Sequence, residues 1–198
     1  MKKILRTIIC LFLTLSVHAQ EGLTVLLGTE IPYDYKKGVY LKDINNVITP
    51  YLGTWEGTLS GKKYTFVFQK FLKIRSGSLE NFYNYSDCIV AKFKVVDVAS
   101  STTLYTSMNA TSIDDFPIFG IPIGSDNYME FIFYDTDANC RNCLEFYLKK
   151  IAGNPNQMQY LKYKYGTDAR YPDDPCSYAN RADIPVFLPP ENLILTKL

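Results

Sequence analysis

One stretch decides the fold: Tyr51-Leu-Gly-Thr-Trp-Glu-Gly-Thr-Leu-Ser-Gly-Lys-Lys-Tyr-Thr-Phe-Val-Phe-Gln69. It contains two runs of residues that change character at every second position, separated by the tight turn Ser60-Gly61-Lys62. A period of two is typical of a strand with one buried face, because successive side chains point to opposite sides. Two such runs around a short turn that contains glycine predict an antiparallel hairpin.

The same period of two continues along most of the chain. It predicts strands at 52–60, 63–72, 88–98, 102–107, 127–134, 143–151, 157–165 and 192–197. Each of these strands has one apolar face to bury, so consecutive antiparallel strands must close into a barrel or pack face to face. We expect an all-β fold, an antiparallel barrel of about eight to ten strands, with a β-sandwich as the alternative.

The N-terminus predicts an export signal. Three basic residues within the first six precede an apolar run at positions 7–17, and Ala19 then stands before Gln20. This order is typical of a secretory signal peptide over residues 1–19, and the apolar run is too short for a permanent membrane span. No later stretch predicts a transmembrane helix. We therefore expect an exported protein, located in the periplasm, on the outer surface or outside the cell.

Composition and charge describe an ordinary globular chain and exclude several functions. Of 198 residues, 47% are hydrophobic and 21% are charged, and the formal net charge is +1. Such a balance provides no basic stripe of the kind that nucleic-acid binding needs. Without residues 1–19 the chain carries 18 Lys and Arg against 20 Asp and Glu, and it loses His18, its one histidine. The absence of imidazole excludes Ser-His-Asp and Cys-His nucleophiles and His-ligated zinc.

The acidic residues do not predict catalysis either. Asp114-Asp115 and Asp173-Asp174 are adjacent in sequence, and adjacent side chains point apart on a strand and are solvated in a Pro-rich loop. Glycoside hydrolysis needs two carboxylates that face each other across a cleft. We expect no enzymatic activity, no cofactor and no metal site.

The remaining organisation is a lead-in, a barrel domain and one long loop. Residues 20–50 form the lead-in, with a short strand at Thr24–Leu27 and a helical turn capped by Asp43, which ends before Pro50. In that turn, one face is expected to hold Ile44, Val47 and Ile48. Residues 51–198 form the barrel domain, in which 166–190 is a loop with five prolines. Loops of this length are usually functional or loosely ordered.

Four cysteines follow the signal segment, which itself contains Cys10: Cys88, Cys140, Cys143 and Cys176. An even number in a chain bound for an oxidising compartment predicts two disulfides. Three pairings are open, and the CxxC formed by Cys140 and Cys143 could also be a redox pair or half of a zinc site. We favour a bond from one of this pair to Cys176 in the long loop.

Aromatic residues are the candidates for ligand binding. The alternation predicts that five of them face into the barrel: Phe66, Phe68, Phe93, Phe131 and Phe133. A barrel of eight strands either fills with side chains or leaves room for one ligand. We expect a non-enzymatic binding module for a small apolar ligand or a peptide, or for a cell-envelope partner. The alternative is a structural or interaction protein whose filled barrel binds a protein or glycan through its Tyr-rich loop.

Gly53-Thr54-Trp55, after a short helical turn and before a hairpin strand, resembles the opening of the lipocalin and fatty-acid-binding superfamily. The resemblance implies a lipocalin-like, calycin-type barrel in which Gly53 and Trp55 are structural, the tryptophan plugging the closed end. The segments 51–58, 61–68 and 188–197 are also similar to a group of uncharacterised secreted proteins of Bacteroidota. That similarity implies export from a Gram-negative cell and brings no known activity with it.

Overall fold

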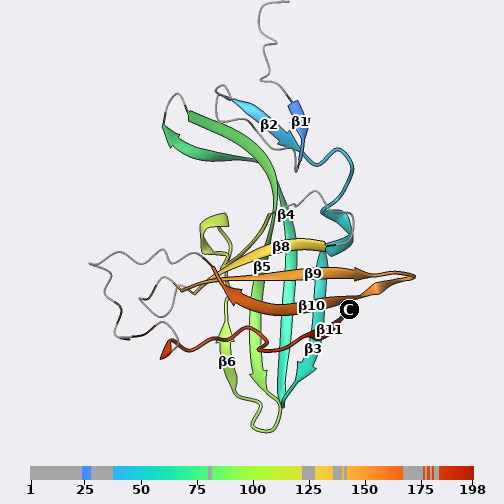
Figure 1. The fold of residues 1–198 in the computed structure, drawn as a ribbon, viewed down its shortest axis with the longest axis vertical. Coiled ribbons are helices and arrows are strands. Elements are labelled where there is room, and N and C mark those ends of the chain that lie inside the picture. The colour runs from blue at the N-terminus through green and yellow to red at the C-terminus, as the bar shows by residue number, and fades with distance from the viewer. Residues whose placement is uncertain are drawn as a thin grey trace, which may run out of the picture.

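A computed structural model of the chain describes residues 24–27, 38–79, 82–121, 128–135, 140, 142–166, 176, 178, 180 and 183–198. Within these ranges the protein is all β, with eleven strands in one sheet and two single-turn 3-10 helices (Figure 1). The strands are β1 Thr24–Leu26, β2 Val39–Lys42, β3 Gly53–Leu59, β4 Lys62–Leu79, β5 Phe82–Asp97, β6 Thr103–Thr106, β7 Ile118–Ile121, β8 Tyr128–Asp135, β9 Asn142–Ile151, β10 Asn154–Tyr165 and β11 Leu193–Lys197. The 3-10 helices are η2 Thr49–Tyr51 and η3 Ile113–Asp115.

Eight of the strands close an antiparallel barrel. Each strand pairs with the next one in the order β3, β4, β5, β7, β8, β9, β10 and β11, and β11 pairs back onto β3. The closing ladder places Thr196 opposite Glu56 and Lys197 opposite Trp55. The expected antiparallel barrel is confirmed, and the alternative of two packed sheets is wrong. Closure removes the exposed sheet edges that a sandwich of the same strands would keep.

Aromatic side chains fill the inside of the barrel. Phe66, Phe68, Phe93, Phe131 and Phe133 face inward as the alternation predicts, and each is at most 2% exposed. Their rings contact one another, with ring centres 4.7 Å apart for Phe66 and Phe93 and 5.1 Å apart for Phe68 and Phe131. The other large core side chains include Trp55, Tyr64, Phe146 and Tyr160. The interior of the barrel is therefore packed, and these five phenylalanines form its core.

The β4–β5 hairpin extends well beyond the barrel. The strands reach Leu79 and begin at Phe82, whereas the sequence predicts an end at 72 and a start at 88. The distal part of this hairpin, residues 72–79 and 82–88, pairs with β2, and β2 pairs with β1, both in parallel. We call this four-stranded unit the arm; Figure 1 shows it rising above the barrel.

The lead-in forms strands and turns, and its helical turn is η2 at Thr49–Tyr51, so the prediction that this turn ends before Pro50 is wrong. Strand β1 confirms the expected strand near residue 24, whereas β2 was not predicted. The carboxylate of Asp43 accepts the amide hydrogen of Val47 at 2.7 Å, but the N-cap of η2 is Ile48 and no side chain caps it, so the predicted cap at Asp43 is wrong. The predicted common face is wrong, because Ile48 is fully buried while Ile44 and Val47 are 52% and 40% exposed. One turn is too short to hold three side chains on the same face.

One of the two predicted disulfides is present. Cys140 is bonded to Cys176, as favoured from the sequence, and this bond ties the start of β9 to the long loop. The second predicted disulfide is wrong, since Cys88 on β5 and Cys143 on β9 keep their thiols. Strands β7 and β8 lie between β5 and β9, so these two residues are not on neighbouring strands. A disulfide needs α-carbons within roughly 7 Å.

Candidate functional site

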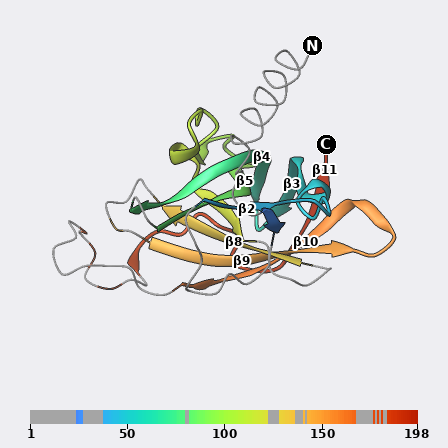
Figure 2. The ribbon, with the colours of Figure 1, turned by 90° about the horizontal axis from the view of Figure 1, so that it is seen from above.

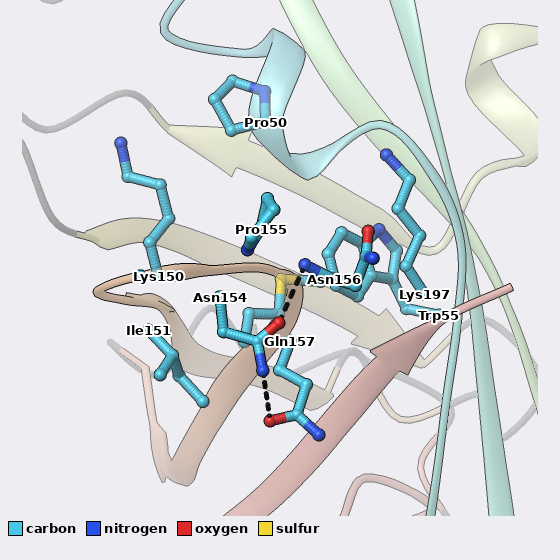
Figure 3. Close-up of a pocket in the computed structure, with 11 residues that line it drawn as sticks. Pro50, Trp55, Lys150, Ile151, Asn154, Pro155, Asn156, Gln157 and Lys197 are labelled. Carbon is cyan, nitrogen blue, oxygen red and sulfur yellow. Dashed lines mark hydrogen bonds between the residues drawn. The ribbon is translucent and has the colours of Figure 1, made fainter.

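A pocket of about 470 Å³ opens at one end of the barrel. It lies between the turn of the β9–β10 hairpin, helix η2 and the end of β11 (Figure 3). Figures 1 and 2 both show this hairpin projecting sideways from the barrel, with its turn beyond the strands. The lining residues are Pro50, Trp55, Lys150, Ile151, Gly153, Asn154, Pro155, Asn156, Gln157, Met158 and Lys197.

Trp55 is a buried residue that lines this pocket. Its side chain is 1% exposed, and its indole Nε1 donates a hydrogen bond of 2.8 Å to the carbonyl oxygen of Tyr51. The single polar atom of the indole is thus satisfied inside the protein. The atoms of the indole ring that face the pocket are apolar, which suits an apolar ligand group.

Two lysines stand at the sides of the pocket. The Nζ of Lys197 lies 5.3 Å from the centre of the Trp55 ring, and the Nζ of Lys150 lies 6.0 Å from the centre of the Tyr51 ring. Figure 3 shows the two side chains on opposite sides of Pro155. Within the described part of the chain neither lysine makes an ion pair, and the lining contains no acidic side chain. The pocket therefore combines apolar walls with uncompensated positive charge.

The hairpin turn supplies a rigid polar wall. The side-chain amide of Asn154 donates to Gln157 Oε1 at 3.0 Å, and the backbone amide of Asn156 donates to Asn154 Oδ1 at 3.2 Å (Figure 3). The pairing of β10 with β9 shifts register between Asn154 and Met158, which is a β-bulge. Bulges are common at barrel rims, where they re-aim side chains. Here the bulge lies at the hairpin tip, beside the pocket.

The geometry favours one kind of ligand. Pockets for small molecules typically measure about 300–1,000 Å³ and combine apolar walls with a few polar groups. An apolar body would pack against Trp55, Ile151 and Pro155, and an anionic group would lie near the two ammonium groups. In the described ranges, no three His, Cys, Asp or Glu side chains lie close enough together to hold a metal ion.

Sequence reasoning did not predict this pocket. None of the five phenylalanines expected to bind a ligand lines it, because all five are used in the core. The residues around Gly153 are typical of a turn, but this pattern does not indicate which part of the protein lies beside the turn. The site combines residues near positions 50, 150 and 197, which meet only because the last strand closes the barrel onto the first.

A second polar cluster lies where the arm joins the barrel. Asp87 Oδ1 accepts hydrogen bonds from the Tyr40 hydroxyl at 2.5 Å and the Lys73 amide at 3.1 Å, and Oδ2 accepts the Asp43 amide at 3.0 Å. The Nζ of Lys70 lies 2.7 Å from Asp43 Oδ2 and 3.9 Å from Asp87 Oδ2. Both carboxylates are buried, with exposures of 6% and 2% for Asp43 and Asp87.

Two members of this cluster, Asp87 and Tyr40, each keep one protonation state near neutral pH. Burial by itself raises the pKa of Asp87, but hydrogen bonds from Tyr40, Asp43 and Lys73 and the charge of Lys70 outweigh it and lower that pKa. Burial and then the Asp87 carboxylate raise the pKa of Tyr40 to about 12. Asp87 stays charged and Tyr40 stays neutral, so the pair ties β2 to β5 within the arm, and Lys70, on the barrel part of β4, links the cluster to the barrel.

Comparisons of the chain with protein-family models, with curated proteins and with solved structures found no match. No helix in the ranges that the structure describes is long and apolar enough to cross a membrane. Several sequence predictions lie outside the described residues: the signal segment 1–19, the carboxylate pair Asp173-Asp174 and most of the loop 166–190.

Proposed function

We propose that this protein is an exported, non-enzymatic binding module that holds one small molecule with an apolar body and an acidic group in the pocket beside Trp55. The observation that carries the proposal is the pair of lysines, Lys150 and Lys197, over a lining without acidic side chains. Charge-assisted hydrogen bonds from ammonium groups to a carboxylate or similar anion are among the strong polar contacts. The apolar lining supplies the rest of the affinity.

The packed core supports a site at the end of the barrel over one inside it. A ligand among Phe66, Phe93 and Phe131 would have to displace rings that are fully buried against one another. Protein interiors are close-packed, and inserting extra atoms forces strained side chains. The pocket beside Trp55 needs no such rearrangement.

Export is the second part of the proposal. It is supported by the signal-like residues 1–19 and by the bond between Cys140 and Cys176, because disulfides persist in oxidising compartments. An exported carrier of a small molecule would function in the cell envelope or outside the cell.

The filled barrel also favours a second candidate, a structural or interaction protein that binds a protein or glycan through its Tyr-rich loop. Tyr163 and Tyr165 contact each other edge to face, with ring centres 6.0 Å apart, just before that loop begins. This candidate needs no pocket. The experiment below therefore separates the two.

The proposal is tested by titration with anilinonaphthalene sulfonate, an aromatic probe with one anionic group. Trp55 is the only tryptophan of the chain, so quenching of its emission reports binding at the pocket. We expect saturable quenching, and we expect Lys150→Glu and Lys197→Glu each to weaken binding about tenfold, equivalent to about 1.4 kcal/mol.

Two controls make the titration specific. Lys149 is exposed and adjacent to Lys150 but does not line the pocket, so Lys149→Glu should leave probe affinity unchanged. The uncharged parent compound, N-phenylnaphthylamine, should bind the two pocket variants as well as the wild type. Unsaturable quenching, or an equal loss in Lys149→Glu, would contradict the pocket site and leave the second candidate.

A further inference from the structure

The arm carries a second surface, built on β2, β4 and β5, none of which lines the pocket. We call it the cationic face; it consists of Tyr40, Lys73, Arg75, Tyr83 and Tyr85. The register sets its members side by side, with Arg75 opposite Tyr85 across β4 and β5, and Tyr85 opposite Tyr40 across β5 and β2. Lys73 and Arg75 are exposed, and the three tyrosines are half-buried.

Aromatic rings hold both cations of this face. The Nζ of Lys73 lies 5.6 Å from the ring centres of both Tyr40 and Tyr85, and the Cζ of Arg75 lies 4.5 Å from the ring centre of Tyr83. Cations are attracted to ring faces, so these contacts orient the charged groups without neutralising them. In the described ranges neither Lys73 nor Arg75 has an acidic partner. Both charges are therefore available to an anion.

A buried carboxylate fixes the position of the face. Lys73 has a φ of +53°, in the left-handed region that lysine rarely adopts, and its amide donates to Asp87. The hydroxyl of Tyr40 donates to the same carboxylate. Lys70 lies 3.9 Å from Asp87 Oδ2 and 2.7 Å from Asp43 Oδ2, so one ammonium group faces two carboxylates, and the cluster offsets only part of the charge of the face. Strained residues held by a buried network cluster at binding sites.

We propose that the cationic face binds an acidic polysaccharide, a glycan that carries uronate carboxylates. The planar guanidinium of Arg75 matches a carboxylate in two parallel hydrogen bonds, and the ammonium of Lys73 pairs with a second one. The half-buried tyrosines offer apolar ring area to sugar rings and hydroxyl groups for hydrogen bonds. The glycan would lie along the arm, which stands clear of the barrel (Figure 1).

The same observations disfavour a nucleic acid as the partner. Single strands bind by stacking successive bases on aromatic faces, and the rings of Tyr83 and Tyr85 stand at 84° to each other. Phosphate binding also depends on many cations, whereas this face has two and the whole chain has a net charge of +1. A chain of sugars needs no parallel stacking on successive rings, so it fits the crossed rings of Tyr83 and Tyr85 better.

The test is binding to immobilised polygalacturonate, with uncharged dextran as the reference polymer. We expect the wild type to bind polygalacturonate and not dextran, and the double variant Lys73→Gln/Arg75→Gln to bind about tenfold more weakly. The variant keeps the amide of residue 73 for Asp87, so the arm keeps its fold. Lys149→Glu, a charge change on the barrel, should bind as the wild type does.

Three results would overturn the proposal: no binding of the wild type to polygalacturonate, equal binding to dextran, or equal weakening in Lys149→Glu. Stronger competition by single-stranded oligodeoxythymidylate than by oligogalacturonate at the same salt concentration would make the face a nucleic-acid site instead. The double variant should still bind anilinonaphthalene sulfonate with wild-type affinity. That readout shows that the variant is folded and that the face is independent of the pocket.

Discussion

The ammonium group of Lys197 lies 5.3 Å from the centre of the Trp55 ring, and the two residues stand directly opposite each other between β11 and β3. This is the ladder through which the last strand closes the barrel. One residue pair thus takes part in closure and also forms one side of the pocket. The position of the lysine depends on Gly53, where an added Cβ would lie 3.1 Å from Lys197 Cε.

Replacing this glycine should therefore affect both stability and binding. Gly53 has a φ of +107°, which strains any residue with a side chain, and the new methyl group would displace Lys197. We expect Gly53→Ala to lower the free energy of unfolding by about 1–3 kcal/mol. Urea unfolding measures the loss, and titration with anilinonaphthalene sulfonate should show weaker binding.

Gly61 provides the matched control for that variant. It also has a positive φ, of +73°, but an added Cβ would meet no atom within 4 Å. Asparagine tolerates this backbone conformation, so Gly61→Asn should cost less than about 1 kcal/mol and leave probe binding unchanged. Equal losses in the two variants would mean that the contact with Lys197 is unimportant.

The carboxylate of Asp87 should be worth much more to stability than an exposed one. Asp87→Asn removes the charge opposite Lys70 and replaces one of the two acceptor oxygens with an amide donor, so at least one buried donor loses its acceptor and we expect a loss of about 2–4 kcal/mol in urea unfolding. Asp114 is exposed, and Asp114→Asn should change stability by less than about 0.5 kcal/mol. Similar values for the two variants would contradict the role given to the cluster.

Acid should weaken the contacts made by the Asp87 carboxylate. Because the pKa of Asp87 is lowered in the folded protein, its contribution is present above the unfolded pKa of about 3.9 and is lost as pH falls through the lower folded value. The free energy of unfolding of the wild type should therefore drop as pH falls below about 4. Asp87→Asn should show a shallower drop over this range, and parallel curves would exclude Asp87 as the source.

The cysteines give a chemical prediction. Peptide mapping without reduction should find Cys140 linked to Cys176 and no link between Cys88 and Cys143. Burial, and then the charge of Asp87, raise the pKa of Cys88 to about 11. At pH 8 roughly one thiol in a thousand is then ionised, so alkylation should be slow and should speed up in Asp87→Asn. Fast alkylation of Cys88 in the wild type would argue against this burial.

The packed interior predicts a large cost for removing a core ring. Phe146 is fully buried and lies 5.3 Å from Phe131 and 5.1 Å from Tyr160, measured between ring centres. Phe146→Ala should lower the free energy of unfolding by about 3–5 kcal/mol. Tyr128 is 38% exposed, and Tyr128→Ala should cost less than about 1 kcal/mol. A small loss for Phe146→Ala would indicate a loosely packed or hollow barrel.

The barrel could be predicted because its signal is local. The alternation around Trp55, Phe66 and Phe68 indicates which side chains face inward, and each strand has such an alternation in its own sequence. Closure then follows from the need to bury all the inward faces together. The link to Cys176 could be favoured among the pairings on the same kind of argument, from the place of the CxxC motif beside a strand and of Cys176 in the long loop.

The arm and the pocket could not be predicted in the same way. Residues from Lys73 to Asp87 lack a clean apolar alternation, because much of the arm faces solvent and its inner support is the polar cluster around Asp87. The pocket depends on the approach of Lys150 and Lys197, which are far apart in sequence. Their proximity is a product of barrel closure and of the bulge in β10, and neither leaves a local sequence pattern.

Native mass spectrometry of the protein recovered from producing cells tests the central claim most directly. The sample is compared with the denatured protein and with the double variant Lys150→Glu/Lys197→Glu. If the pocket carries a small acidic molecule, the wild type shows a mass excess that vanishes on unfolding and that the double variant lacks. An excess that the double variant retains, or no excess in either protein, would contradict a ligand held beside Trp55.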